Sequence, residues 1–262
     1  MNAQTTPEFR WLERGSGDPV ILLHGLMGEM WHWEPSLDVL GDTCRAIAPS
    51  LPIFDPALPE VSVPELARHV VRLLDALEIS HAVVGGNSLG GHVALELALE
   101  HRHRVTGVVL TGSSGLFERG FTRNVPHAPT IHYVRMKMEE IFYDPTLVTP
   151  DWVQSVARVV TTRSTAVRVV QFARAAKRHN VEAELHRIAV PTLLVWGKDD
   201  RITPPEVAER FHALIPGAEL VFVTNCGHAP MLERPEAFTE IVGEWLRETS
   251  RGRAAMAREG AR

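Results

Sequence analysis

The chain has 262 residues, of which 45% are hydrophobic and 23% charged, ordinary values for a globular protein large enough to bury a sizeable core. Its formal net charge of −5 gives no reason to expect nucleic-acid binding. No apolar run approaches the ~20 residues needed to cross a bilayer, so we expect no membrane partner.

The N-terminus and the cysteines bear on the compartment. Residues 1–7 are polar and lack the basic start and apolar core of a secretory signal. The two cysteines, Cys44 and Cys226, do not resemble a disulfide framework. Both observations favour a cytoplasmic protein with reduced thiols.

The first half of the chain alternates strand-like and helix-like segments. Short apolar runs bounded by turn residues predict strands at 20–23, 44–48, 82–85 and 105–111. A helix is predicted to begin near Pro64, between the second and third runs. Its apolar residues recur at helical spacing: Leu66, Val70, Leu73, Leu74 and Leu77. This alternation predicts an α/β fold with a mostly parallel sheet and helices on both faces.

The alternation stops at about residue 116 and resumes near residue 189. Residues 116–188 show helical patterning without a convincing strand, and we predict that they form a helical lid inserted in the core. The core is expected to comprise residues 1–115 and 189–250. Its later elements are strands at 191–196 and 220–223, a helix from about Pro205 and a last helix at about 235–246. Residues 251–262 have few apolar side chains and are expected to form a flexible tail.

The segment Gly86–Gly90 is a candidate nucleophile site. It reads Gly-Asn-Ser-Leu-Gly and lies between a predicted strand and an apolar stretch of helical length. A Ser between two glycines at such a junction matches the nucleophile elbow, in which a strained turn exposes the hydroxyl. The helix that follows favours developing negative charge near its N-terminus. Ser88 is therefore the candidate nucleophile.

A Ser hydroxyl needs a general base, and the base needs an orienting carboxylate. Among the 13 histidines, His228 lies in a loop directly after the last predicted strand, which is where a base is expected. The carboxylate candidates are Asp199 and Asp200, which follow the strand at 191–196. Asp200 is better placed if Gly197–Asp199 makes the turn, and Asp199 is then a solvated turn residue.

These motifs together resemble the α/β-hydrolase superfamily, in the lidded branch that contains carboxylesterases and C–C bond hydrolases. The resemblance runs from about Phe9 to Leu246. It rests on His24–Gly28, the Ser88 elbow, Trp196–Asp200 and Gly227–His228. It implies that Asp200 is the acid of a Ser88–Asp200–His228 triad.

The resemblance also implies further site residues and a reaction. The backbone N–H groups of Leu26 and Leu89 match the oxyanion hole of the superfamily. The activity expected is hydrolysis of a small-molecule carboxylic ester through an acyl-enzyme on Ser88, with no metal and no organic cofactor. Thioester or amide hydrolysis and acyl transfer would use the same residues, and the sequence does not indicate an oligomeric state.

Two other functions are compatible with the resemblance. C–C bond hydrolases of ring-cleavage products share Asn87 before the nucleophile. They differ in carrying Gly-Pro-Gly after the His-Gly pair and a Trp where this chain has Ala229. The second alternative is a non-catalytic ligand-binding receptor, because the same fold also serves as a hormone-binding scaffold.

Several residues are candidates for the substrate pocket. Asn87 adjoins the nucleophile, and Trp31 follows the oxyanion loop, where it would line an acyl pocket or fill space against the sheet. Met138 and Phe142 lie in the predicted lid, where they would form an adaptable apolar wall or the core of the lid itself.

Overall fold

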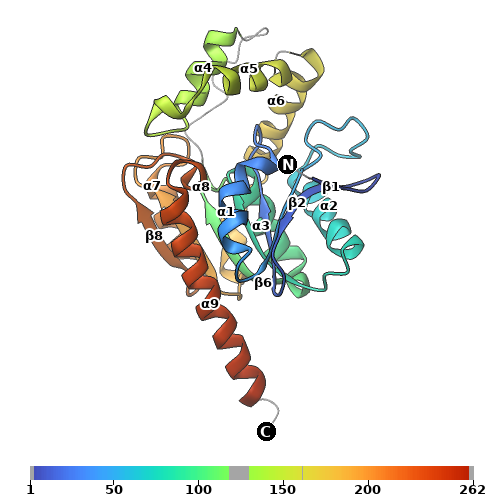
Figure 1. The fold of residues 1–262 in the computed structure, drawn as a ribbon, viewed down its shortest axis with the longest axis vertical. Helices are drawn as coiled ribbons and strands as arrows, with labels where there is room; N and C mark the ends of the chain where they lie inside the picture. Colours follow the sequence, from blue (N-terminus) through green and yellow to red (C-terminus); the bar gives the residue numbers. More distant parts are fainter. Residues whose placement is uncertain (1–2, 118–129, 161, 260–262) are drawn as a thin grey trace.

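The computed structural model describes residues 3–117, 130–160 and 162–259, with side chains up to Gly252. Its centre is an eight-stranded sheet in the order β1-β2-β4-β3-β5-β6-β7-β8 (Figure 1). The strands are β1 (Gln4–Thr5), β2 (Arg10–Arg14), β3 (Pro19–Leu23), β4 (Arg45–Pro49), β5 (Ala82–Asn87), β6 (Val105–Thr111), β7 (Thr192–Gly197) and β8 (Glu219–Val223). Strands β3 to β8 pair in parallel, which confirms the predicted α/β fold with a mostly parallel sheet.

Two strands at one edge were not predicted. Strand β2 pairs antiparallel with β4, and β1 pairs antiparallel with β2. Strand β2 reads Arg-Trp-Leu-Glu-Arg, so only Trp11 and Leu12 in it are apolar, and β1 has only two residues. A short charged edge strand lacks the continuous apolar run that marks a strand buried on both faces.

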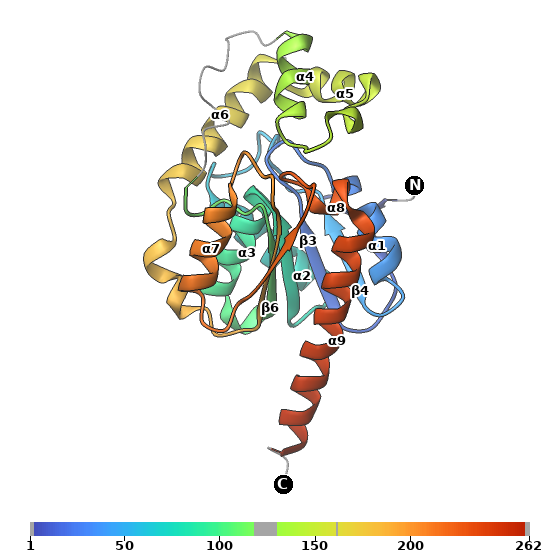
Figure 2. The ribbon, with the colours of Figure 1, turned by 90° about the vertical axis from the view of Figure 1, so that its left-hand side faces the viewer.

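Helices cover both faces of the sheet (Figure 2). On one face, α2 (Val63–Ala76), α3 (Leu89–Glu100) and α7 (Pro205–Leu214) pack with Ile21 and Leu23 of β3 in one apolar cluster. On the other face, α1 (Glu34–Leu40) and α9 (Pro235–Glu259) pack with Val20 and Leu22 of the same strand. Successive residues of a strand point to opposite faces, so each continuous apolar run supplies both clusters.

Local signals in the sequence set the ends of helix α2. The Ser62 hydroxyl accepts a hydrogen bond from the Glu65 backbone N–H at 3.2 Å, which caps the helix at its start. Pro64 lies in the first turn, where its missing N–H costs nothing. The apolar residues of the predicted stripe then face the sheet, with Leu66, Val70 and Leu73 fully buried.

Between β6 and β7, the described residues form three helices: α4 (Ile131–Glu139), α5 (Pro150–Val160) and α6 (Arg163–Arg178). Figure 2 shows them beyond one end of the sheet, on the side where β3 leads into the loop that follows it. Short 3-10 turns connect this region, at η3 (Pro145–Leu147) and η4 (Glu182–Arg187).

The last helix is longer than predicted. We expected it to end near Leu246, but α9 continues to Glu259 and extends away from the body of the molecule (Figure 1). Residues 251–259 of the predicted tail are therefore helical. Apart from Gly252, these residues are Ala, Arg, Met and Glu, and they explain the difference because they are strong helix formers. None of the helices in the described ranges is both long enough and apolar enough to span a membrane.

Candidate active site

Ser88 lies at the turn between β5 and α3 and has a positive φ. Its φ of 55° and ψ of −117° are strained for a residue with a side chain, so surrounding contacts must hold the turn. The Ser88 carbonyl accepts hydrogen bonds from the backbone N–H of Ser114 at 3.1 Å and from the Ser114 hydroxyl at 3.3 Å. The strained turn predicted from the sequence is therefore present and is held by the residues that follow β6.

The two glycines of the elbow are required by close backbone contacts. A Cβ at Gly86 would lie 2.3 Å from the carbonyl carbon of Gly90. A Cβ at Gly90 would lie 2.1 Å from the carbonyl oxygen of Leu23. Both distances are far below van der Waals contact, so only glycine allows helix α3 to start this close to β3 and β5.

His228 and Asp200 form a buried pair. The Nδ1 atom of His228 lies 2.8 Å from Oδ2 of Asp200, and the side chains of both residues are almost fully buried. Asp199 is exposed, and its backbone N–H donates to the Cys226 carbonyl. Between the two predicted carboxylates, the structure brings Asp200 to the imidazole and leaves Asp199 at the surface.

Thr203 completes the surroundings of Asp200, and it was missed in the sequence. Its hydroxyl donates to Asp200 Oδ2 at 2.9 Å, and the backbone N–H groups of Ile202 and Thr203 donate to Asp200 Oδ1 at 2.8 and 3.0 Å. These three donors fix the orientation of the Asp200 carboxylate. The Asp-x-x-Thr spacing, which is compatible with a local side-chain-to-backbone turn, is the signal that could have indicated it.

The loop that carries His228 is held from two sides. The Asn87 amide donates from Nδ2 to the His228 carbonyl at 2.8 Å and to the Thr111 carbonyl at 3.1 Å. Asn87 thus ties the residue before the nucleophile to the loop of the candidate base. On the other side, the carboxylate of Glu233 in α8 (Pro230–Glu233) accepts from the backbone N–H groups of Gly227 and Asp144. No local pattern in the sequence indicated this role of Glu233.

The predicted oxyanion residues, Leu26 and Leu89, both border the cavity at Ser88. Leu89 is the first residue of α3, so its N–H has no acceptor within the helix. Leu26 lies in the loop after β3, and the side chain of His24 holds this loop in place. The His24 Nε2 atom accepts from the Leu51 N–H at 2.9 Å, and Nδ1 contacts the Gly25 carbonyl at 2.9 Å. Burial lowers the pKa of His24 to about 4, so the ring is neutral at pH 7.

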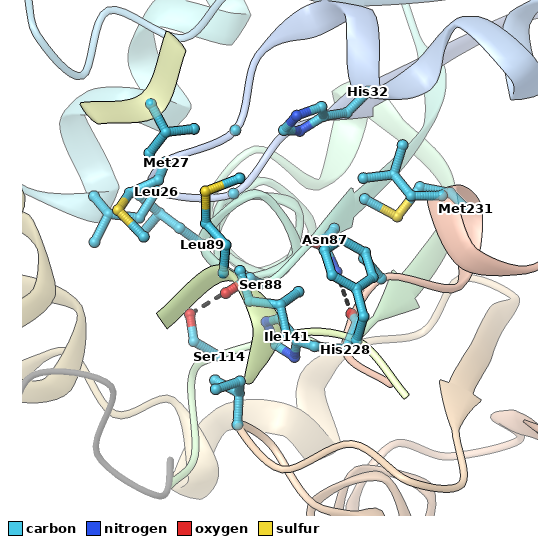
Figure 3. Close-up of a pocket in the computed structure, with 18 of the residues that line it drawn as sticks. Leu26, Met27, His32, Asn87, Ser88, Leu89, Ser114, Ile141, His228 and Met231 are labelled. Atoms are coloured by element: carbon cyan, nitrogen blue, oxygen red, sulfur yellow. Dashed lines mark hydrogen bonds between the residues drawn. The ribbon is translucent and has the colours of Figure 1, made fainter. Parts of the chain in front are cut away.

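Ser88 and His228 line one cavity of about 130 Å³ (Figure 3). Asn87, Met138 and Phe142, which were predicted to line the pocket, are among its walls. Helices α4, α5 and α6 contribute much of the apolar lining, with Met138, Trp152, Val156, Phe172, Ala173 and Ala176. Among the described residues that line this cavity there is no Lys, Arg, Asp or Glu.

Trp31 is the predicted pocket residue that the structure places elsewhere. It is 38% exposed and borders a second cavity of about 190 Å³, which His32 also lines. Its ring contacts the rings of His32 and Trp152 at centroid distances of 4.1 and 5.7 Å. Trp31 packs against α5 and therefore does not line the cavity at Ser88. No local pattern in the sequence predicts this packing.

The described residues contain no group of three or more His, Cys, Asp or Glu side chains placed to hold a metal ion. The two free cysteines are buried, and burial raises the pKa of Cys44 to about 11.

A mostly parallel sheet with a Ser-His-Asp arrangement at the carboxyl ends of its strands is the architecture of an α/β hydrolase. The sequence profile described as "Alpha/beta hydrolase family" matches residues 20–241. The chain therefore belongs to the α/β-hydrolase family, as the sequence motifs indicated.

Three known proteins illustrate the likeness. The chain is 29% identical over 248 residues to 2-hydroxy-6-oxo-2,4-heptadienoate hydrolase of Pseudomonas putida, covering 88% of this chain and 90% of that protein. It matches the structure of an α/β-hydrolase enzyme from a sediment metagenome of the Mar Chica lagoon, Morocco, with 32% identity, a TM-score of 0.78 and coverage of 95% and 100%. It also matches a thermophilic esterase from Thermogutta terrifontis, with 26% identity, a TM-score of 0.73 and coverage of 94% and 97%.

Proposed function

We propose that this hydrolase cleaves a small-molecule carboxylic ester through an acyl-enzyme on Ser88. The observation that carries the proposal is that Ser88 and the Asp200-paired His228 line the same cavity. A nucleophile at a strained turn, a base and an orienting carboxylate are the groups that acyl transfer requires.

The proton movements follow from the pairing of His228. Because Nδ1 is bonded to Asp200, Nε2 is the nitrogen that accepts the Ser88 proton as Oγ attacks the ester carbonyl. Asp200 stabilises the imidazolium that forms, and Nε2 then returns the proton to the departing alcohol. Water enters, gives its proton to Nε2 and attacks the acyl carbon. The imidazolium then returns that proton to Ser88 Oγ as the acid is released.

The negative charge of both tetrahedral intermediates falls on the former carbonyl oxygen. The N–H groups of Leu26 and Leu89 are the proposed donors to it, and the N-terminus of α3 adds a favourable dipole. Loss of one such donor typically costs about 10²- to 10³-fold in rate. In this proposal, helices α4 to α6 form the lid, because they supply apolar walls to the cavity.

The lining of the cavity supports an uncharged ester as the substrate. A buried carboxylate needs a cationic partner or several donors, and the described lining residues include no Lys or Arg. Ala229 also borders the cavity, at the position where the resemblance to C–C bond hydrolases predicts Trp. The structural likeness to the thermophilic esterase from Thermogutta terrifontis also supports ester hydrolysis.

The second candidate is hydrolysis of a C–C bond in a ring-cleavage product. The observation that favours it is the 29% identity to 2-hydroxy-6-oxo-2,4-heptadienoate hydrolase over 88% of this chain. Such a reaction would use the same Ser, His and Asp, and its substrate would bring a carboxylate into the cavity.

A panel of 4-nitrophenyl esters of rising acyl length, assayed beside 2-hydroxy-6-oxo-2,4-heptadienoate, tests the proposal. We expect turnover of at least one ester, a kcat/KM for the ring-cleavage product that is orders of magnitude lower, and loss of both in Ser88→Ala. A fluorophosphonate probe should label the wild type once per chain and leave Ser88→Ala unlabelled. Preferred turnover of the ring-cleavage product would establish the second candidate, and binding without turnover of either would identify a receptor.

A further inference from the structure

His32 is a buried polar residue that the proposed reaction does not use. It lies in η1 (Met30–Trp33), is 8% exposed and borders both the cavity at Ser88 and the second cavity beside Trp31. Figure 3 shows its ring among the side chains that surround the first cavity. His32 therefore lies where the two cavities adjoin.

Aromatic neighbours fix the orientation of the His32 ring. Trp31 packs edge-on against it at 4.1 Å between ring centroids, and Trp152 of α5 packs edge-on at 5.6 Å. A ring packed against two indoles has little freedom to turn its nitrogens toward other partners. The direction of its polar edge is thus built into the fold.

The hydrogen bond to Nδ1 determines which nitrogen carries the proton. The backbone N–H of Glu29 donates to His32 Nδ1 at 3.4 Å, so Nδ1 is the acceptor and the proton of a neutral ring is on Nε2. Burial lowers the pKa of His32 to about 3, which keeps the ring neutral at pH 7. His32 is therefore a neutral donor through Nε2–H.

That donor has no acceptor among the residues that the structure describes. Nε2 is buried and makes no hydrogen bond within this part of the chain, although nearly all buried polar groups in proteins are paired. His32 lines the substrate cavity, and an N–H on such a residue that lacks a protein acceptor is suited to an acceptor on the bound molecule.

We infer that His32 is a specificity-determining residue whose Nε2–H donates a hydrogen bond to an uncharged oxygen of the substrate, at a distance from the scissile carbonyl. The inference rests on the proposed function and names its substrate class: an ester that carries a keto, hydroxyl or ether oxygen in its acyl or alcohol part. An uncharged oxygen fits because both His32 and the described cavity lining are neutral. A plain alkyl ester would leave the N–H unpaired, which disfavours it.

Two matched ester pairs test the inference. On the acyl side, 4-nitrophenyl 5-oxohexanoate is compared with 4-nitrophenyl hexanoate, with rates divided by spontaneous hydrolysis. On the alcohol side, 3-oxobutyl acetate is compared with butyl acetate. We expect the wild type to prefer the oxygenated member of at least one pair by roughly 10- to 100-fold in kcat/KM. His32→Phe should abolish this preference, and His32→Gln, which retains a donor, should restore part of it.

A control variant separates specificity from stability. His69→Phe replaces another buried histidine, which lies in α2, packs on Phe9 and does not line the cavity, so it should keep the wild-type preference. If the role of His32 were purely structural, His32→Phe would lower kcat/KM equally for both members of a pair. No preference in either pair of the wild type, or a preference that survives in His32→Phe, would overturn the inference.

The test remains decisive if no ester is turned over, an outcome that would count against the proposed function alone. Binding of the same pairs to Ser88→Ala and to Ser88→Ala/His32→Phe is then measured by calorimetry. A preference of roughly 10-fold or more for an oxygenated ester that disappears with His32 supports the inference. Equal affinities for both members of both pairs would refute it.

Discussion

The backbone N–H of His228 donates to the carbonyl oxygen of Ile141 at 2.7 Å. Ile141 follows α4, so the candidate base is hydrogen-bonded directly to the segment inserted between β6 and β7. The contact also explains the glycine that precedes His228, because a Cβ at Gly227 would lie 2.4 Å from the same Ile141 oxygen. The inserted segment and the loop of the base thus pack directly on one another.

This packing predicts that Met138 of α4 and Phe142, which follows Ile141, influence the choice of substrate. Met138 and Phe142 are buried and line the cavity, so Met138→Ala and Phe142→Ala should shift the preferred acyl length toward longer esters. The ceiling for such a shift is roughly ten- to two-hundred-fold in relative kcat/KM. Met136→Ala is the matched control, because Met136 is on the same helix but is 41% exposed. An unchanged ranking in both cavity variants would place specificity outside this segment.

The environment of Asp200 predicts a large difference between two neighbouring carboxylates. Asp200→Asn should reduce kcat on the order of 10⁴-fold, because an amide does not hold the His228 tautomer that leaves Nε2 as acceptor. Asp199→Asn removes the same charge from an exposed side chain and should change kcat little. Steady-state kinetics of the two purified variants measures this. Equal losses would mean that His228 is oriented by another group.

The close approach of α3 to β3 makes Gly90 a structural requirement. The Cβ of Gly90→Ala would meet the Leu23 carbonyl oxygen at 2.1 Å, and backbone atoms cannot move aside as a side chain does. We expect a loss of about 1–3 kcal/mol or more in the free energy of unfolding, measured by urea titration. Gly252→Ala is the control: nothing lies within 4 Å of its Cβ, and Ala is the better helix former. A Gly90→Ala protein as stable as the wild type would contradict this close approach of the two backbones.

Each element that was predicted correctly is indicated by a pattern within its own short stretch of sequence. Continuous apolar runs marked the six parallel strands, and Gly86–Gly90 marked the turn at Ser88. The packing of Trp31 and His32 depends instead on Trp152, which is more than a hundred residues away in the chain. How α5 docks on η1 is decided by tertiary packing, so no pattern within either segment could reveal it.

Four buried histidines predict how stability depends on pH. Burial lowers the pKa of His24 and His69 to about 4 and of His32 and His92 to about 3. The ordinary value is about 6.5, so above it both the folded and the unfolded chain hold these rings neutral. As the pH falls below about 6.5, the unfolded chain binds protons that the folded chain does not. The free energy of unfolding should therefore decrease from about pH 6.5 down toward pH 4.

His69→Phe measures the contribution of one of these four histidines to the pH dependence of the free energy of unfolding. His69 is buried beside Phe9 at a ring distance of 5.0 Å, so an aromatic replacement retains the packing. Each histidine contributes at most about 1.4 kcal/mol per pH unit to the slope, and the variant should lose up to that much of it between about pH 6 and pH 4.5. Urea titrations of both proteins at several pH values give the two slopes. Identical slopes would show that His69 takes up its proton in the folded state as readily as in the unfolded state, against the effect of its burial.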